Sequence, residues 1–209
     1  MCDLMTMFDG VAVVDVEATG LDSRKCSIVS VGVVLYSEGK VREYYYECKP
    51  FKGAVINDEA LEINGATRKE LRSPKRLPQK KMMTDIYKVL KSHGVHTIAG
   101  QNTSFDRDFL DSAARRCKVR WDFGHRTIDM HSIAYAIMLK KKMAIPTKEG
   151  HRNHLTADVI YTYLGMPEEP RPHNGLTGAR MEFEGLARMV YGKSLLDEFK
   201  GYKVTGYHM

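Results

Sequence analysis

The first third of the chain is organised by hydrophobic runs and by alternation. A hydrophobic run predicts a buried strand over residues 10–17 and a second over 27–36. Alternating apolar and polar positions predict a more exposed third strand over 41–48. Short turns between consecutive strands favour antiparallel pairing. We therefore expect an antiparallel meander at the start of the fold.

Helical periodicity dominates the remainder of the chain. The pattern predicts, in order, short helices over 58–63 and 68–71, a helix over 79–92, a strand over 96–100, and helices over 105–117, 130–140, 154–164 and 174–191. The basic, turn-rich stretch 140–153 is predicted to be a loop. This order is typical of an α/β domain with a mixed central sheet flanked by helices. No linker marks a domain boundary, so residues 1–209 are expected to form a single domain.

Composition narrows the class of protein. The 209 residues suffice for a sizeable core. The chain contains no run of about 18 apolar residues, the length that a membrane span needs, so no membrane partner is expected. The opening MCDLMTMFDG lacks the apolar segment of a secretory signal. Four widely separated cysteines are typical of free thiols, which indicates a cytoplasmic or other reducing intracellular compartment. The net charge of +6 suits a polyanionic partner.

Two acidic residues interrupt the first predicted strand, in the sequence VVDVEATG at 13–20. Residues two apart in a strand point to the same face, so Asp15 and Glu17 project side by side, with Val14 and Val16 on the other face. Adjacent carboxylates repel and are costly to bury, and a divalent cation such as Mg²⁺ or Mn²⁺ removes the conflict. The alternative is a strand that ends at Val14, with both acids solvated in the following turn.

A second acidic site follows the predicted strand 96–100. Asp106 stands at the start of the next predicted helix, where it joins Asp15 and Glu17 as a candidate metal ligand. The alternative is an aspartate that interacts with the helix dipole.

Neither GxGxxG nor GxxxxGK[ST] occurs in the chain, which argues against a nucleotide-binding α/β protein.

Five segments carry a pattern that extends over nearly the whole chain. They are DVEATGL (15–21), ALEINGATRKEL (60–71), AGQNTSFD (99–106), TIDMHSIA (127–134) and HNGLTGAR (173–180). Together they resemble the DnaQ-like 3′–5′ exonucleases of the DEDD superfamily, and the histidine that opens the last segment indicates the DEDDh branch. The resemblance covers about residues 10–191 and implies an α/β, ribonuclease H-like fold with a mixed central sheet.

The resemblance also implies a reaction. It implies a metal-dependent hydrolase that releases nucleoside monophosphates from nucleic-acid 3′ ends. Two Mg²⁺ or Mn²⁺ ions are implied, one that activates water and one that stabilises the leaving 3′ oxygen. It implies that Asp15 bridges both ions, that Glu17 contacts one ion and the terminal nucleotide, and that Asp106 holds the second ion. It implies that His173 is the general base, a role that suits histidine because its unperturbed pKa is ~6.5. The alternative for His173 is an ordinary loop histidine.

Substrate contacts follow from the same resemblance. Thr19, Gly20 and Leu21 match the position whose backbone touches the 3′ hydroxyl and whose leucine wedges against the last bases. Asn102 and Phe105 match residues beside the substrate. The alternatives are a turn glycine at Gly20, a turn cap at Asn102 and a core aromatic at Phe105. The implied partners are single-stranded DNA or RNA 3′ ends, and the chain is expected to be stand-alone or a subunit beside a polymerase or another nucleic-acid-processing partner.

The chain departs from the family pattern at the fourth carboxylate, five residues after His173, where Gly178 stands. The metal cluster then lacks one ligand, so impaired catalysis is expected. Glu182 lies one turn later on the same helix face, and Asp158 on a preceding helix offers another acid. Three explanations stay open: a substituted and inactivated protein, a natural non-catalytic module that still binds single-stranded 3′ ends, or an active enzyme with a relocated ligand.

Overall fold

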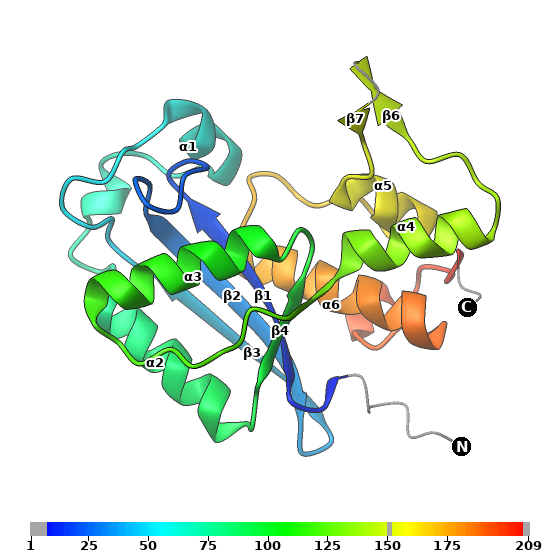
Figure 1. The fold of residues 1–209 in the computed structure, drawn as a ribbon, viewed down its shortest axis with the longest axis horizontal. Coiled ribbons are helices and arrows are strands. Elements are labelled where there is room, and N and C mark those ends of the chain that lie inside the picture. Colours follow the sequence, from blue (N-terminus) through cyan, green and yellow to red (C-terminus); the bar gives the residue numbers. More distant parts are fainter. Residues whose placement is uncertain (1–7, 150–151, 207–209) are drawn as a thin grey trace.

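The computed structural model describes residues 8–149 and 152–206. Its centre is a five-stranded sheet with the strand order β3-β2-β1-β4-β5 (Figure 1). The strands are β1 (Val11–Ala18), β2 (Ile28–Ser37), β3 (Lys40–Glu47), β4 (Thr97–Gly100) and β5 (Thr127–Asp129). The first three pair antiparallel, β4 runs parallel to β1, and β5 runs parallel to β4. The predicted meander and the predicted mixed sheet are both confirmed.

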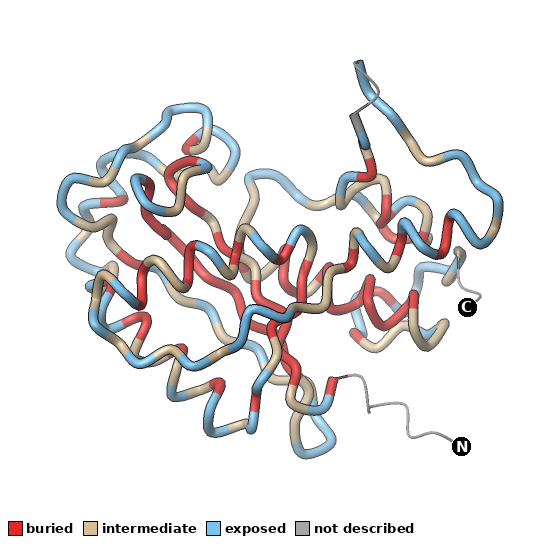
Figure 2. Tube along the Cα trace, viewed as in Figure 1, coloured by how far each residue is buried: buried red, intermediate tan, exposed pale blue. Residues whose placement is uncertain are grey.

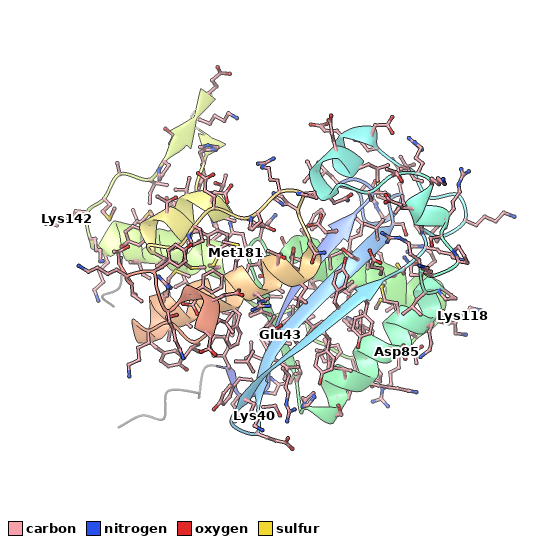
Figure 3. The ribbon with its side chains drawn as sticks, turned by 180° about the vertical axis from the view of Figure 1, so that it is seen from behind. Lys40, Glu43, Asp85, Lys118, Lys142 and Met181 are labelled. Carbon is pink, nitrogen blue, oxygen red and sulfur yellow. The ribbon has the colours of Figure 1, made fainter. Side chains whose placement is uncertain are left out.

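Helices cover both faces of this sheet. They are α1 (Asp58–Asn64), α2 (Gln79–Ser92), α3 (Ser104–Cys117), α4 (Met130–Lys140), α5 (Ala157–Tyr163) and α6 (Gly175–Tyr191), with single 3₁₀ turns at Glu70–Arg72 and Asp197–Phe199. Helices α2 and α3 lie on one face (Figure 1). Seen from behind, α6, marked by Met181, crosses the opposite face (Figure 3). Helices α4 and α5 pack against α6.

Side-chain caps decide where several helices begin. The Asn174 carboxamide oxygen accepts hydrogen bonds from the backbone N–H groups of Leu176 and Thr177, at 3.0 and 3.4 Å, so α6 begins at Gly175. The Thr156 hydroxyl caps α5 in the same manner. That helix therefore begins at Ala157 rather than at the predicted residue 154.

Two β elements were not predicted. Strand β5 immediately precedes α4, and three residues are too few to show a period. The predicted loop over 140–153 was wrong in part, because it contains the hairpin strands β6 (Thr147–Lys148) and β7 (Arg152–Asn153). This hairpin projects from the body beyond α4 and α5 (Figure 1). Thr147 and Lys148 are both exposed, and strands of two residues are too short to show a core-facing pattern.

The two faces of β1 contribute to different cores. Its even-numbered apolar residues pack with α2 and α3, and its odd-numbered apolar residues pack with α4, α5 and α6. Figure 2 shows the buried residues concentrated along the strands and the inner sides of the helices. Asp15 and Glu17 continue the odd-numbered face within the strand. The predicted alternation is confirmed, and the alternative in which the strand ends at Val14 is wrong.

Three of the four cysteines fall in the described part of the chain. Cys26, Cys48 and Cys117 are all free there, and Cys2 lies outside the described residues. Burial raises the pKa of the Cys48 thiol to about 12. Among residues 8–149 and 152–206, no helix is both long and apolar enough to cross a membrane.

Two glycines let the first turn of α6 touch the middle of the sheet. Gly32 on β2 pairs with Asp15 on β1. A Cβ atom at Gly32 would lie 2.0 Å from the carbonyl oxygen of Gly175, the first residue of α6. A Cβ atom at Gly175 would lie 2.8 Å from the backbone nitrogen of Gly32. Because the atoms in the way belong to the backbone, this contact fixes the distance between α6 and the sheet at Asp15.

We expect Gly32→Ala to destabilise the protein by at least about 3 kcal/mol, at the upper end of overpacking costs, since no side chain can rotate out of the way. Gly201→Ala is the matched control, because no atom lies within 4 Å of a Cβ built there. Urea unfolding of both variants measures the difference. Equal stability of the two variants would show that α6 docks more loosely than the structure indicates.

Candidate active site

The end of β1 carries two acidic side chains past its pairing with β4. Strand β1 pairs with β4 from Val11 to Val13 and with β2 as far as Ala18. Asp15 and Glu17 lie in this overhang and are half-buried, and the Asp15 carboxylate faces α6 at Gly178. An interior strand thus places two carboxylates at the point where the sheet splits.

Asp106 joins them from the first turn of α3. The N–H of Val16 lies beyond the last β1–β4 pair, and it donates to Asp106 Oδ1 at 2.9 Å. Asp106 is only 3% exposed. The structure therefore brings the three sequence-predicted acids together, two from β1 and one from α3, with Asp106 tied to the backbone between the other two.

Two glutamates from other elements also point into this region. Glu182 on α6 is 5% exposed. A Cβ atom built at Gly100, the last residue of β4, would lie 2.9 Å from Glu182 Oε2. Glu169, in the loop before α6, places Oε1 at 3.4 Å from a Cβ atom built at Gly178. We call Asp15, Glu17, Asp106, Glu169 and Glu182 the carboxylate cluster.

Sequence reasoning did not find Glu169, because it lies in an irregular loop outside every motif. Its proximity to the cluster depends on how the loop folds back, which no local pattern encodes. Asp158, the other acid considered, has a different place. Its Oδ1 accepts the backbone N–H of Glu169 at 3.1 Å and so supports the loop.

Burial and mutual repulsion raise the pKa values throughout the carboxylate cluster. Burial raises the pKa of Asp15 well above its usual range, and the charges of Asp106 and Glu17 raise it further. Burial, followed by the charges of Asp15 and Asp106, raises the pKa of Glu182 in the same direction. Burial raises the pKa values of Glu17 and Glu169 to about 7. A nearby cation would reverse this preference for the neutral form.

His173 lies in the loop that leads into α6. Its backbone N–H donates to the carbonyl oxygen of Ile63 at 3.0 Å, and its Nδ1 lies 3.7 Å from Glu169 Oε2. Burial, and then the charge of Arg171, lower the pKa of His173, so the imidazole is neutral near pH 7. Its Nε2 is buried and has no hydrogen-bond partner in the described part of the chain. A neutral imidazole with an unpartnered ring nitrogen suits a proton acceptor.

The cluster has the chemistry of a site for hard divalent cations. As the side chains lie, no group of three or more histidine, cysteine, aspartate or glutamate residues within 8–149 and 152–206 is arranged to hold an ion. The donors are nonetheless all carboxylates, the ligand type that Mg²⁺ and Mn²⁺ prefer. Glu182 Oε2 and Glu169 Oε1 are buried without a hydrogen-bond partner among those residues. A divalent cation bound among these carboxylates would supply a partner for such an oxygen.

Gly178, the position of the expected fourth carboxylate, lies directly against Asp15. A Cβ atom built there would lie 2.2 Å from Asp15 Oδ2. With Asp15 in this orientation, the space that a side chain at position 178 would fill is already taken by the Asp15 carboxylate.

The three residues after β1 differ in their availability to a ligand. The Thr19 hydroxyl donates to the carbonyl oxygen of Val55 at 2.6 Å and accepts the N–H of Ser27 at 2.9 Å. The backbone N–H and carbonyl of Thr19 are also bonded within the protein, so Thr19 holds the loop in place. A Cβ atom at Gly20 would lie 2.7 Å from the Cys26 sulfur. Leu21, by contrast, is 87% exposed.

Asn102 and Phe105 flank the start of α3. Asn102 is exposed in a left-handed conformation (φ 54°), and its backbone N–H donates to Asp129 Oδ1 at 3.0 Å. The Phe105 ring is half-buried against Phe109, with the ring centroids 4.7 Å apart. Both residues lie within one turn of Asp106 in the sequence, and their predicted contacts with a substrate stay predictions.

A family model described as "Exonuclease", of the RNase T type, matches residues 12–184. This match takes in the whole carboxylate cluster and His173. The chain belongs to this exonuclease family. The resemblance to DnaQ-like DEDD exonucleases is therefore confirmed.

Curated relatives of this chain include bacterial ribonucleases T. Ribonuclease T of Vibrio campbellii is 26% identical over 122 residues, which cover 52% of this chain and 56% of the relative. Ribonuclease T of Shewanella baltica is 28% identical over 122 residues, which cover 52% of this chain and 53% of the relative. The chain thus spans about half the length of the curated relatives it matches.

Solved structures of another exonuclease share the fold. E. coli Exonuclease I in complex with a dA16 oligonucleotide matches with a TM-score of 0.66 and 16% identity, over 85% of this chain and 40% of that chain. Its complex with a dT13 oligonucleotide matches with a TM-score of 0.68 and 16% identity, over 85% and 40%. The predicted ribonuclease H-like fold is confirmed.

In the presence of a chelator, we expect the free energy of unfolding to fall as the pH rises from about 5 to about 7. Glu17 and Glu169 have pKa values of about 7 in the native state against 4.5 as the reference for an unfolded chain. The native state then binds more protons than the unfolded state over this range, and stability is lost as the protons leave. The lowered pKa of His173 opposes this trend, but as one group against several carboxyl groups.

Urea unfolding at pH 5, 6, 7 and 8 in EDTA measures this slope, and Glu169→Gln should flatten it. Saturating Mg²⁺ should raise the stability most at the highest pH. A stability in EDTA that rises steadily between pH 5 and 7 would contradict the electrostatic description of the cluster.

Proposed function

We propose that the chain is a metal-dependent 3′–5′ exonuclease that works as one domain and releases nucleoside monophosphates from single-stranded DNA or RNA. The observation that carries the proposal is the convergence of Asp15, Glu17 and Asp106 beside β1, with His173 on the neighbouring loop. Membership of the exonuclease family and likeness to ribonuclease T support it.

Asp15, Glu17 and Asp106 are the residues that would hold Mg²⁺ or Mn²⁺, two ions in the mechanism that the resemblance implies. Bound ions of this kind lower the pKa of water and stabilise charge on phosphate oxygens. His173 accepts the proton of the attacking water, and its lowered pKa keeps it in the accepting form at neutral pH. Asp106 is held rigidly for its role by the bond from the Val16 N–H.

The loop after β1 presents an apolar side chain beside cations. Leu21 is 87% exposed. The side chains of Arg24 and Lys25 are 86% and 72% exposed and share one acid, Asp22, at 3.5 and 3.6 Å, so the loop keeps a net positive charge. An exposed leucine can pack against an unstacked base, while the cations attract the phosphate backbone. This combination favours a single-stranded end over a paired one. The solved complexes of Exonuclease I with dA16 and dT13 support the same class of substrate.

Gly178 favours a second candidate function, a non-catalytic module that binds single-stranded 3′ ends. Without a carboxylate at that position, the ions lose one ligand unless another acid replaces it. Strand affinity depends on phosphate and base contacts elsewhere, so it would survive the loss of chemistry.

With Mn²⁺ or Mg²⁺, we expect the chain to shorten 3′-end-labelled single strands and Asp15→Asn to lower the rate by roughly a thousandfold. Loss of an ion-holding carboxylate removes several kcal/mol of transition-state stabilisation. Quenched single-turnover assays on matched DNA and RNA oligomers measure the rates.

A covalently closed circle is the control substrate and should stay intact. Cleavage of the circle would refute an end-dependent exonuclease. Tight binding of linear strands with no cleavage under any condition would establish the second candidate function instead.

We expect Leu21→Ala to raise the KM for single strands about tenfold, which corresponds to about 1.4 kcal/mol of lost binding free energy. The reason is that the Leu21 side chain is not packed in the protein core and is available to the substrate. Stability should change by less than about 0.5 kcal/mol. Leu139→Ala is the matched control, since Leu139 on α4 is another exposed leucine, at 55%. Equal KM values for the two variants would remove Leu21 from the substrate site.

A further inference from the structure

We propose that Glu182 is the fourth ion-holding carboxylate of this site, reaching from one turn beyond the position that the family pattern assigns. The inference rests on the proposed exonuclease function and names a residue for it. It also assigns a purpose to Gly178, which leaves room for the Asp15 carboxylate between β1 and α6.

The direction of α6 places Glu182 over the end of β4. Residues four apart in a helix share a face, so Gly178 and Glu182 both face the sheet. The contact between Gly32 and Gly175 holds the first turn of α6 against β1 and β2. Gly178 then meets Asp15, and the next turn brings Glu182 to Gly100 at the end of β4. This is the split between β1 and β4 into which Asp106 also reaches.

The Glu182 carboxylate is buried with one oxygen left without an internal partner in the described residues. The residue is 5% exposed, and its Oε2 has no hydrogen-bond partner in the described residues. A backbone bond from Gln101 supports the carboxylate. Burying a carboxylate with an unpartnered oxygen is costly, and placing it among other acids increases the cost. A divalent cation in the cluster supplies the missing partner.

Glu169 is the competing residue, because its Oε1 is also unpartnered among those residues and lies near Gly178. Its position differs from that of Glu182 in two respects. Glu169 is partly exposed whereas Glu182 is buried, and Glu169 lies on a loop rather than on a helix packed against the sheet. Its Oε2 lies 3.7 Å from His173 Nδ1, so Glu169 is placed to orient the imidazole.

The test compares Glu182→Gln with the wild-type chain, with Asp15→Asn and with Glu168→Gln. Glu168 is an exposed acid next to Glu169, so its variant removes one charge from the neighbourhood without touching the cluster. Mn²⁺ affinity is measured by calorimetry, thermal stability is measured in EDTA, and cleavage is measured in single turnover. Glu182→Asp is a second variant that keeps the charge and withdraws the carboxylate by one methylene.

We expect Glu182→Gln and Glu182→Asp to weaken Mn²⁺ binding at least about tenfold, and Glu182→Gln to slow cleavage by about a hundredfold or more. In EDTA, Glu182→Gln should melt no lower than the wild type, because it removes a buried like charge. Glu168→Gln should match the wild type in all three measurements. Gly178→Asp should not accelerate cleavage, because its Cβ displaces the Asp15 carboxylate.

Two results overturn the inference alone. In the first, the Glu182 variants bind Mn²⁺ and cleave like the wild type while Asp15→Asn loses both activities. In the second, Gly178→Asp cleaves at least tenfold faster than the wild type. A wild-type chain that neither binds Mn²⁺ nor cleaves overturns the proposed function together with the inference. The two failures are therefore distinguishable.

Discussion

The contact between the first turn of α6 and the middle of the sheet is the constraint on which the candidate active site depends. Because the backbones of Gly32 and Gly175 touch, the helix has no freedom to rise from β1 and β2 at this point. His173 precedes this turn and Glu182 follows it on the sheet-facing side. A single backbone contact thus sets the position of the proposed base and of two consecutive helical turns relative to Asp15.

Two glutamates on α6 show that burial alone does not mark a functional acid. Glu184 is fully buried, yet its oxygens accept bonds from Arg188 Nε at 2.7 Å and from the N–H groups of Leu195 and Leu196. That acid is satisfied, and it ties the C-terminal segment to the helix. Glu182 is two residues away, faces the sheet, and has an oxygen with no partner in the described part of the chain. The fold therefore supplies hydrogen-bond partners for Glu184, which has a structural role. It leaves Glu182 facing a cluster of like charges, where a bound cation would offset the repulsion.

The parts of the site that could be predicted from sequence are those that depend on regular periodicity. Alternation in β1 predicts that Asp15 and Glu17 share a face, and helical spacing predicts that Glu182 shares a face with Gly178. Glu169 could not be predicted, because its approach to the cluster follows from a loop without any period. The close fit of Gly32 to Gly175 is equally hidden, since the two glycines are far apart in sequence and neither belongs to a turn. Strand β5 and the β6–β7 hairpin escape prediction because two or three residues are too few to show alternation.

Gly178 and Glu182 are best understood as one unit. If position 178 had merely lost a ligand, alanine would serve the helix better than glycine, by about 1 kcal/mol. Alanine would have a cost of its own here, however, because its Cβ would lie 2.2 Å from Asp15 Oδ2 and the Asp15 carboxylate would have to turn away. Gly178 leaves room for the Asp15 carboxylate next to α6. Glu182, one turn later, has one methylene more than an aspartate, so its carboxylate reaches the split between β1 and β4. An ion responds to where oxygen atoms lie and not to the spacing of the motif that delivers them, so a chain that fails the family spacing can still present a complete set of carboxylates.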